Sequence, residues 1–179
     1  MSIKNVIATA SLQAKLDLDK VECGLSGDSF QGLCWTNRAF GSLNIKSDKS
    51  TLFQLFKNGR VIVVGGTTEG QTKRIFLRYL GLLSDLGISI DYQDYHIQNI
   101  VACYDYGQKL DLYSVAQSHK FEFEPELFPA VRYRDKTLKV TVNIFHTGKC
   151  TILGAKSAEV VSEAVCKVRE ILQNAKFSG

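Results

Sequence analysis

The chain lacks the cysteine and histidine patterns that mark disulfide frameworks and metal sites. It contains five cysteines and three histidines, but no two cysteines stand at C-x-x-C spacing and the histidines form no cluster with them. The number of cysteines is also odd, which argues against complete pairing into disulfides. We therefore expect no metal, no cofactor and a reducing compartment inside the cell.

Long apolar runs are missing as well. No stretch approaches the ~18 apolar residues of a membrane span, and the start of the chain, Met1 to Asn5, has no apolar region of the kind found in signal peptides. Two prolines in 179 residues argue against a disordered linker. Because 45% of the residues are hydrophobic, a sizeable core can form. These features predict a soluble intracellular protein without membrane contact.

Catalytic patterns are absent, and the excess of positive charge is small. The sequence shows no carboxylate cluster, no nucleophile–base pair and no metal-ligand spacing, so it does not predict an enzyme.

The formal net charge is +4, divided equally between residues 1 to 94 and residues 95 to 179. A balance of this size permits nucleic-acid binding without demanding it.

An internal repeat is the most informative feature that the chain does contain. Asn5 is followed ten residues later by Lys-Leu-Asp-Leu, and Asn99 is followed by the same four residues at the same spacing. Phe56 to Gly66 and Phe145 to Ala155 also correspond. The offsets are 94 and 89 residues, so the halves differ by about one short turn. Two copies of one unit predict a pseudo-two-fold object, whose concave surface would suit a duplex.

We place the repeats at 1–94 and 95–179, as one intertwined structure with the same order of elements in each. The helix from Thr68 has the expected apolar stripe, and Gly87 would end it. Residues 24–38 resemble a loop. The first repeat is predicted to contain strands at 3–12, 40–46, 51–56 and 61–65 and helices from 16 and over 68–86; the second contains strands from 97 and at 130–135, 138–145 and 149–154, with helices from 110 and over 157–175.

The expected core-facing residues of the two long helices are Ile75, Tyr79, Leu82, Leu83 and Leu86 in the first and Val161, Val165, Val168 and Leu172 in the second. Runs of strands that alternate with helices in this order predict an α+β fold. In such a fold the helices cover one face of an antiparallel sheet and leave the other face free.

Several sequence segments resemble those of the TATA-box-binding protein family, including its TBP-like factors. The run from Phe123 to Ala130 resembles the family element aromatic-E-P-E-L-F-P-G, and Tyr95 to Val101 resembles F-K-I-Q-N-I-V. The hairpins at 58–60 and 147–149 resemble its S-G-K. The resemblance spans essentially the whole chain and is stronger in the second half. It implies a pseudo-two-fold saddle: a curved antiparallel sheet of about ten strands with its concave face on the DNA minor groove and four helices on the convex face.

The resemblance also implies two intercalating phenylalanines in each half. Proteins of this kind drive apolar wedges between base steps from the minor groove. In the second half the wedges map to Phe128 and Phe145, and in the first half Phe56 matches cleanly. Its partner is Phe40 if the following turn has lost one residue, whereas a gapless alignment places Ala39 there.

Residues that would contact the floor of the groove surround these wedges. An amide donor at the start of each half, on Asn5 and Asn99, can reach the acceptors that every A·T pair shows in the minor groove. The remaining residues of this set are Ile7, Gln54, Ile62, Val64, Val101, Leu127, Pro129, Asn143, Thr151 and Leu153. Candidate phosphate contacts are Lys46, Arg60, Arg134, Lys139 and Lys149.

Two further surfaces match those that the family offers to protein partners. Glu124, Glu126 and Leu127 match the segment offered to transcription factor IIB or a IIB-related factor. Lys73, Arg78 and Tyr79 match the helix that meets transcription factor IIA, and TBP-associated regulators are further partners that the resemblance implies. Asp85 departs from the lysine that is usual there.

The presumed DNA face carries four departures from the family, and they are mirrored between the halves. Val64 and Leu153 each replace a threonine, and Gln54 and Asn143 each replace a leucine. Loss of a hydroxyl donor leaves a base-edge acceptor unpaired and costs about 1–3 kcal/mol. We expect an altered DNA specificity with weakened TATA preference.

Two functions from different classes follow. The first is a nuclear transcription initiation factor that binds and bends promoter DNA and nucleates the preinitiation complex. The second is a protein-interaction module that keeps its partner surfaces but no longer binds TATA specifically. Because an unfilled apolar face is an exposed patch, self-dimerisation through it is a third use of the same surface.

Overall fold

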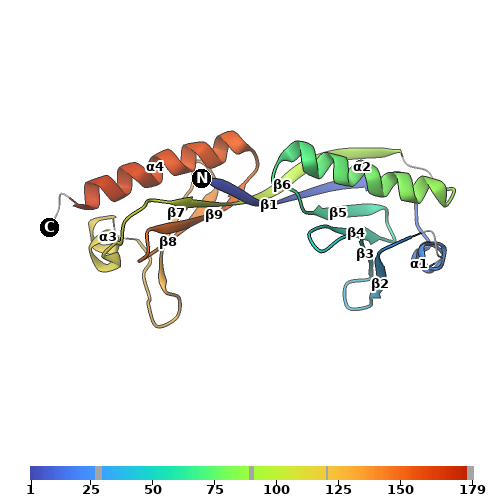
Figure 1. The fold of residues 1–179 in the computed structure, drawn as a ribbon, viewed down its shortest axis with the longest axis horizontal. Helices are drawn as coiled ribbons and strands as arrows, with labels where there is room; N and C mark the ends of the chain where they lie inside the picture. The colour runs from blue at the N-terminus through green and yellow to red at the C-terminus, as the bar shows by residue number, and fades with distance from the viewer. Residues whose placement is uncertain (27–29, 89–90, 120, 177–179) are drawn as a thin grey trace. The chain divides into compact units, whose positions relative to one another are not determined.

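The computed structural model describes residues 1–26, 30–88, 91–119 and 121–176 (Figure 1). Within them the chain forms nine strands and four helices. In chain order these are β1 (Ser2–Leu12), α1 (Leu18–Leu25), β2 (Leu33–Asn37), β3 (Ser42–Lys46), β4 (Leu52–Phe56), β5 (Arg60–Val64), α2 (Glu69–Asp85), β6 (Tyr92–Asp105), α3 (Leu112–His119), β7 (Ala130–Asp135), β8 (Val140–Phe145), β9 (Lys149–Ala155) and α4 (Ala158–Lys176).

The strands form an antiparallel sheet with the hydrogen-bonded order β2-β3-β4-β5-β1-β6-β9-β8-β7. The predicted α+β class, with an antiparallel sheet and four helices, is confirmed, with nine strands in place of about ten. The chain divides into two compact units. The first unit is Asn5–Gln98, and the second unit combines Met1–Lys4 with Asn99–Gly179. The division therefore falls inside β1 and β6, a few residues beyond the repeat boundary expected from the sequence.

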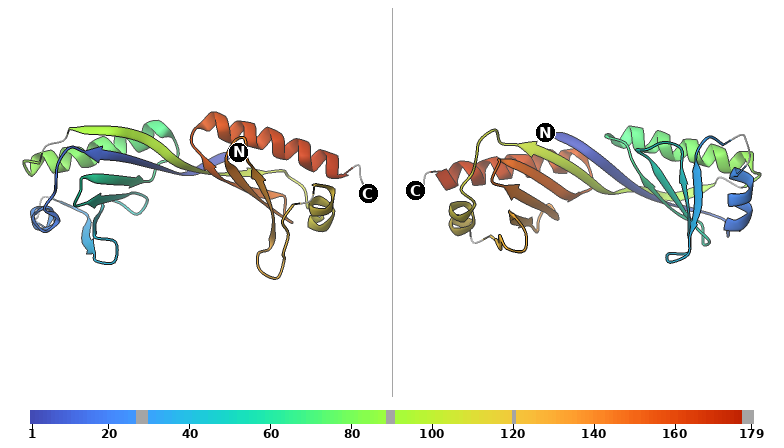
Figure 2. Two further views of the ribbon diagram at one scale, coloured as in Figure 1. Left: turned by 180° about the vertical axis from the view of Figure 1, so that it is seen from behind. Right: turned by 60° about the horizontal axis from the view of Figure 1, so that its bottom comes forward.

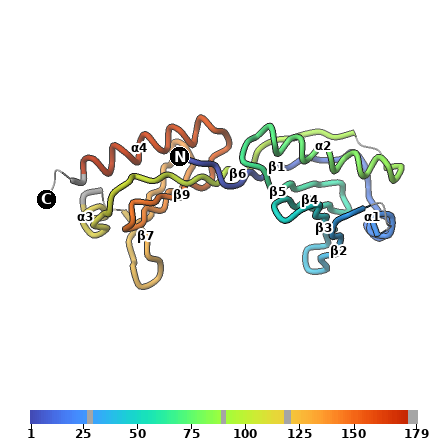
Figure 3. The backbone as a smooth tube through the Cα atoms, viewed as in Figure 1, coloured from blue at the N-terminus to red at the C-terminus, as the bar shows by residue number. Residues whose placement is uncertain are grey.

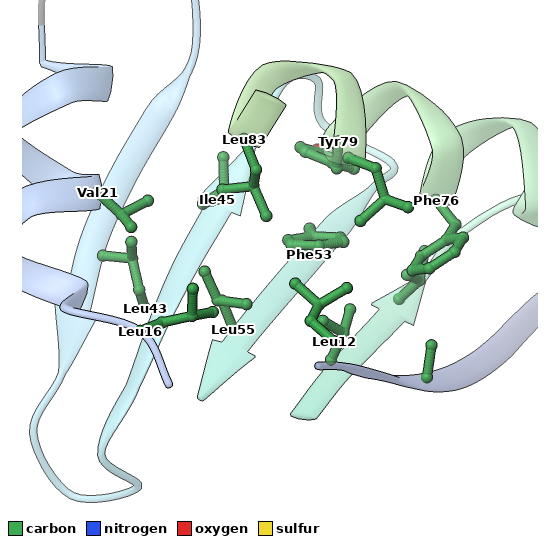
Figure 4. Close-up of a cluster of buried hydrophobic side chains, with 14 of the residues drawn as sticks. Leu12, Leu16, Val21, Leu43, Ile45, Phe53, Leu55, Phe76, Tyr79 and Leu83 are labelled. Carbon is green, nitrogen blue, oxygen red and sulfur yellow. The ribbon is translucent and has the colours of Figure 1, made fainter. Parts of the chain in front are cut away.

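The core of the first unit lies between α2 and one face of its strands (Figure 4). Phe53 on β4 is fully buried, stacks on Tyr79 with 4.8 Å between ring centroids and lies 6.5 Å from Phe76. Phe76 and Leu80 were missing from the predicted core stripe of this helix, whereas Leu82 is only partly buried. The stripe is therefore rotated toward the aromatic side chains that α2 packs on β4.

The second unit is built in the same way, with α4 on one side of its strands (Figure 2). Val161, Val168 and Leu172 are fully buried as predicted, but Ala164 replaces Val165 as the fourth core residue. On the strands beneath them, Ile144 and Ile152 have no exposed surface.

A capping side chain and glycines with positive φ determine where α2 begins and ends and how the hairpins turn. The Thr68 hydroxyl accepts a hydrogen bond from the backbone N–H of Gln71 and caps α2, and Gly87 follows the helix with a φ of 76°. Gly59 and Gly148 occupy the same place in the β4–β5 and β8–β9 hairpins, with φ of 82° and 84°. A side chain at either position would strike a backbone carbonyl, so glycine is required there.

Three sequence-based expectations need correction. Residues 24–38 do not form one loop, because Leu33–Asn37 forms the edge strand β2. Strand β6 begins at Tyr92, five residues before the expected start, and α3 begins at Leu112 instead of 110. Short exposed segments such as β2 have little hydrophobic alternation, so pairing with β3 decides their conformation.

Candidate nucleic-acid interface

In the first unit, the strand face away from α2 carries a row of paired side chains. Cross-strand partners lie on the same face of a sheet, and the register sets Thr9 opposite Ile62, Ile62 opposite Gln54, Gln54 opposite Asn44 and Asn44 opposite Trp35. Their chain neighbours, such as Val61 and Leu55, point to the core and are fully buried. Ile7 and Val64 form the next pair on the same face, which we call the open face of the first unit.

The second unit has a corresponding open face on the side away from α4. Cys103 lies opposite Thr151, Thr151 opposite Asn143, and Asn143 opposite Arg132. Thr141 pairs with Leu153 in the next row. Val101, two residues before Cys103 on β6, belongs to the same side of that strand. The structure thus brings most of the predicted groove-floor residues of each repeat together on one face of its own unit.

The predicted wedge residues have the same register in both units. Phe145 lies opposite Ala130, and Phe128 precedes Ala130 by two residues. Phe56 likewise lies opposite Ser42, and Phe40 precedes Ser42 by two residues. This register favours Phe40 over Ala39 as the partner of Phe56.

The aromatic rings are accessible and not sealed beneath helices. Phe128 and Phe145 pack edge to face with 6.0 Å between their centroids, and both remain half-buried. Phe40 is 71% exposed in the turn between β2 and β3, which extends away from α2 in Figures 1 and 3. A wedge must be accessible to enter a base step. Phe40 is exposed, and Phe56, Phe128 and Phe145 are half-buried, so each ring keeps some accessible surface.

Asn99 offers a hydrogen-bond donor toward the open face of the second unit. Its Oδ1 accepts a hydrogen bond from the backbone N–H of Gly154 at 2.7 Å. The amide is thereby oriented with its NH₂ group free to donate, which suits the acceptors of an A·T pair. Asn5, the equivalent residue of the first unit, is half-buried near the start of β1.

The candidate phosphate contacts are cationic side chains near strand ends. Arg60 and Lys149 begin β5 and β9 and are exposed, Lys46 ends β3 and is half-buried, and Lys139 is exposed in the β7–β8 turn. Arg134 on β7 is also exposed, but its guanidinium lies 3.5 Å from the carboxylate of Glu122. That carboxylate also lies 3.7 Å from Arg132, so it neutralises part of the positive charge at this edge.

Next to Phe145, the second unit has a hollow of about 690 Å³. Its lining includes Lys4, Lys149, His146 and Cys103. The lining also includes Asp105 and Met1, so cationic, anionic and apolar groups meet beside this aromatic ring. Among the described residues, no group of three or more His, Cys, Asp and Glu side chains is placed to hold a metal ion. None of the described helices is long and apolar enough to cross a membrane.

The predicted partner-binding residues differ in their exposure to solvent. Leu127 is 81% exposed in a turn closed by two backbone hydrogen bonds to the carbonyl of Glu124, and Glu126 is exposed beside it. Arg78 is exposed on α2. The prediction that Tyr79 binds a partner is wrong. Its side chain is 1% exposed and its hydroxyl contacts Ser47 and Thr51, so it is a core residue and cannot meet a partner directly.

Lys73 is held by aromatic rings of its own unit. Its ammonium donates a hydrogen bond to the Tyr92 hydroxyl at 2.8 Å and lies 3.8 Å from the ring centroid of Tyr95 and 5.2 Å from that of Phe76. Cation–π contacts of this kind compete with contacts to a partner. Burial, with nearby Glu69 and Tyr92, raises the pKa of Tyr95 to about 12.

The geometry of these units agrees with comparisons to known proteins. The family described as transcription factor TFIID, or TATA-binding protein (TBP), matches residues 1–86 and 94–175 of this chain. The chain belongs to the TBP family. It is 33% identical to the TATA-box-binding protein of Methanothrix thermoacetophila over 97% of this chain and 96% of that protein. It is 30% identical to the TATA-box-binding protein of Schizosaccharomyces pombe over 96% of this chain and 73% of that protein.

A solved TBP structure also matches. Methanococcus jannaschii TBP has a TM-score of 0.83 with this chain at 28% identity, and the match covers 97% of this chain and 98% of that one. The resemblance seen in the sequence is thereby confirmed. TBP-family proteins are DNA-binding transcription factors that act in transcription initiation, and the comparisons indicate no enzyme family.

Sequence reasoning within the TBP family missed several open-face residues. Trp35 is 40% exposed on β2, Asn44 is buried on β3, and Cys103 and Arg132 lie on β6 and β7. Trp35 was overlooked because its segment was predicted to be a loop. The other three could have been found from the alternation of side chains along a strand. Each lies either two residues along its strand from a residue assigned to this face or directly opposite such a residue.

Proposed function

We propose that the chain is a general transcription initiation factor that binds promoter DNA through the minor groove, bends it and nucleates the preinitiation complex. The observation that carries this proposal is the pair of accessible phenylalanines in each unit, at mirrored register positions beside its open face. The eukaryotic relatives favour a nuclear location.

The aromatic pairs supply the physical basis for bending. Inserting an apolar side chain between base pairs unstacks one step and costs a few kcal/mol, which the larger contact area of a bent duplex repays. Ile7, Ile62 and Val64 in the first unit and Val101 and Leu153 in the second give apolar surface for the sugars and base edges beside each step. Cations at the strand ends would hold the phosphates on either side.

Partner binding would use surfaces away from the open faces. The exposed turn with Glu124, Glu126 and Leu127 suits transcription factor IIB or a IIB-related factor. Arg78 on α2 suits transcription factor IIA, with Lys73 contributing only if it leaves its aromatic neighbours. Other regulators of the TBP family are further candidates for the same helix.

We further propose that preference for TATA sequences is weakened. Val64 and Leu153 place methyl groups where the family resemblance leads us to expect hydroxyl donors, so base-edge acceptors beneath them stay unpaired. Gln54 and Asn143 place amides where the family resemblance leads us to expect leucine side chains. Competition between an A·T-rich, readily bent duplex and a scrambled duplex tests this point: similar affinity supports it, and a strong TATA preference contradicts it.

Bending itself is tested by energy transfer between dyes at the two ends of a short duplex. The proposal predicts closer ends on binding and an affinity that falls steeply with salt, because released counterions accompany phosphate contacts. Phe128→Ala with Phe145→Ala should reduce the approach of the ends, because only the wedges of the first unit remain. Leu77→Ala, on the exposed side of α2, serves as the control and should bend DNA normally.

A protein-interaction module is the second candidate, and one observation favours it. Buried amides on each open face, Asn44 and Asn143, are unusual for a surface that only packs against sugars and base edges. If the chain binds the IIA and IIB factors but shortens no duplex, this second function is correct. Sedimentation would separately reveal a dimer that buries the open faces.

A further inference from the structure

Each unit holds a buried side-chain amide oxygen that has no hydrogen-bond donor. These atoms are Oδ1 of Asn44 in the first unit and Oδ1 of Asn143 in the second. The two residues are 3% and 9% exposed. A buried acceptor without a donor is destabilising, so it needs a reason to be retained. Both residues lie on the open face of their unit, where the proposed ligand would lie.

The amide of Asn143 is oriented by its neighbour. Its Nδ2 donates to the hydroxyl of Thr151 at 3.2 Å, so the oxygen is the atom left to interact with a ligand. Asn99 in the same unit shows the opposite arrangement, because its oxygen is engaged by the Gly154 N–H and its NH₂ group is left free. The open face of the second unit therefore presents one amide donor and one amide acceptor.

The first unit repeats this acceptor in a neighbouring position. Asn44 lies directly opposite Gln54, and Gln54 occupies the place that Asn143 has in the second repeat. The chain neighbour Ile45 points to the core, which places the Asn44 amide on the open face. Both units thus bring an amide acceptor to the middle of the surface that faces DNA.

Only one group on the floor of the minor groove can donate to such an oxygen. A·T pairs show acceptors alone, whereas a G·C pair adds the N2 amino group of guanine. We propose that this chain recognises G·C-containing sites, with Oδ1 of Asn143, and Oδ1 of Asn44 in the first unit, accepting from guanine N2. The inference rests on the proposed minor-groove binding and gives that site its base preference.

The Asn143 oxygen is buried in the free protein and must become accessible to meet guanine N2. Asn143 and Phe145 lie two residues apart on β8, so their side chains are on the same face of the strand. Phe145 packs against Phe128 in the free protein. Insertion of the rings into a base step would have to expose the Asn143 oxygen for this contact to form. An A·T pair in that position would place one of its minor-groove acceptors against the Asn143 oxygen, which is also an acceptor. The same oxygen therefore disfavours an A·T pair there.

Inosine gives a direct test, because it differs from guanine only by lacking the N2 amino group. A single G·C pair is moved through each position of an A·T-rich duplex, and each duplex is compared with its inosine counterpart by fluorescence anisotropy. We expect guanine to bind more tightly by about three- to tenfold at one or two positions. Diaminopurine in place of adenine there, which adds the amino group to an A·T pair, should also bind more tightly.

Variants assign the contact. Asn143→Leu and Asn44→Leu should each remove the guanine–inosine difference at one position, whereas Ser162→Ala, on the exposed side of α4, should retain it. Urea unfolding checks that each variant is folded, and the inosine comparison on the unaltered chain needs no variant.

Equal or tighter binding of inosine at every position overturns the inference. If those duplexes are still bent, minor-groove binding stands and only the guanine contact is lost. If no duplex is bent, the proposed function fails as well.

Discussion

Individual charged side chains in the second unit divide into structural and functional groups. Asp135 is buried, and its carboxylate accepts from the Lys167 ammonium at 2.6 Å, from the Tyr133 hydroxyl and from the backbone N–H groups of Thr137 and Leu138. It fixes the β7–β8 turn to α4. Glu122, in contrast, is exposed and lies beside cations that the proposal assigns to DNA.

Asp135→Asn should destabilise the protein by about 2 kcal/mol, because Lys167 loses its anionic partner. Burial raises the pKa of Asp135, but the hydrogen bonds from Lys167 and its other donors outweigh burial and hold the pKa well below its usual range. The ionised carboxylate therefore stabilises the fold above about pH 4, and this contribution is lost as the pH falls further.

Urea unfolding at pH 7 and at pH 3 measures both effects. Asp85→Asn, on an exposed carboxylate at the end of α2, is the control and should change stability by less than about 0.5 kcal/mol. A difference between Asp135→Asn and the unaltered chain that does not shrink at pH 3 contradicts the role of the ionised pair.

Glu122→Gln should raise affinity for duplex DNA by about two- to fivefold at low salt, with less effect at high salt. The carboxylate attracts Arg132 and Arg134 in the free protein and repels phosphate, and the amide does neither. Anisotropy titrations measure the change. Glu163→Gln, an exposed glutamate on α4, should leave affinity unaltered; a matching gain there would show a general charge effect.

At the scale of elements, the parts set by strong local chemistry were predictable and the parts set by pairing were not. The alternating strands β4, β5, β8 and β9 and the capped helix α2 follow from the sequence within about two residues. Strand β2 was missed because Leu33 and Trp35 are exposed, and because pairing with β3 and hydrogen bonds from Thr36 to Glu22 hold the strand. The helical pattern placed Tyr79 correctly in the core, whereas the family resemblance assigned it to a partner surface that burial beneath β4 and the turn at Ser47 rules out.

The hairpin glycines give an element-scale prediction. Gly148→Ala should lower the free energy of unfolding by at least ~2 kcal/mol, because φ of 84° strains alanine and its Cβ would strike the carbonyl of Gln108. Gly81→Ala in α2 has open space around the new methyl group and should stabilise by ~0.5–1 kcal/mol. Thermal unfolding compares the two, and a neutral Gly148→Ala would show that this hairpin can relax.

At the scale of the whole molecule, one duplex should engage both units. Each unit contains its own probe on its open face: Trp35, the single tryptophan, in the first unit and Cys103 in the second. Burial and nearby Asp105 raise the pKa of Cys150 to about 12, and burial with Glu22 raises that of Cys34 to about 11, so both thiols stay protonated. Exposed Cys23 and Cys166 serve as reference thiols.

Binding of DNA should change Trp35 fluorescence and slow alkylation of Cys103 at the same DNA concentration. Alkylation of Cys23 and Cys166 should continue at its original rate, since neither lies on an open-face strand. Mass spectrometry of the labelled peptides measures this. A response of only one probe would show that a single unit binds the duplex.

Fluorescence of 2-aminopurine placed at successive base steps tests most directly whether the mirrored aromatic pairs open the minor groove. The signal should rise at two separated steps, because an unstacked 2-aminopurine is brighter than a stacked one. Phe128→Ala with Phe145→Ala should remove one rise, and Phe40→Ala with Phe56→Ala the other. Binding with no rise at any step would show that the phenylalanines do not enter the base stack.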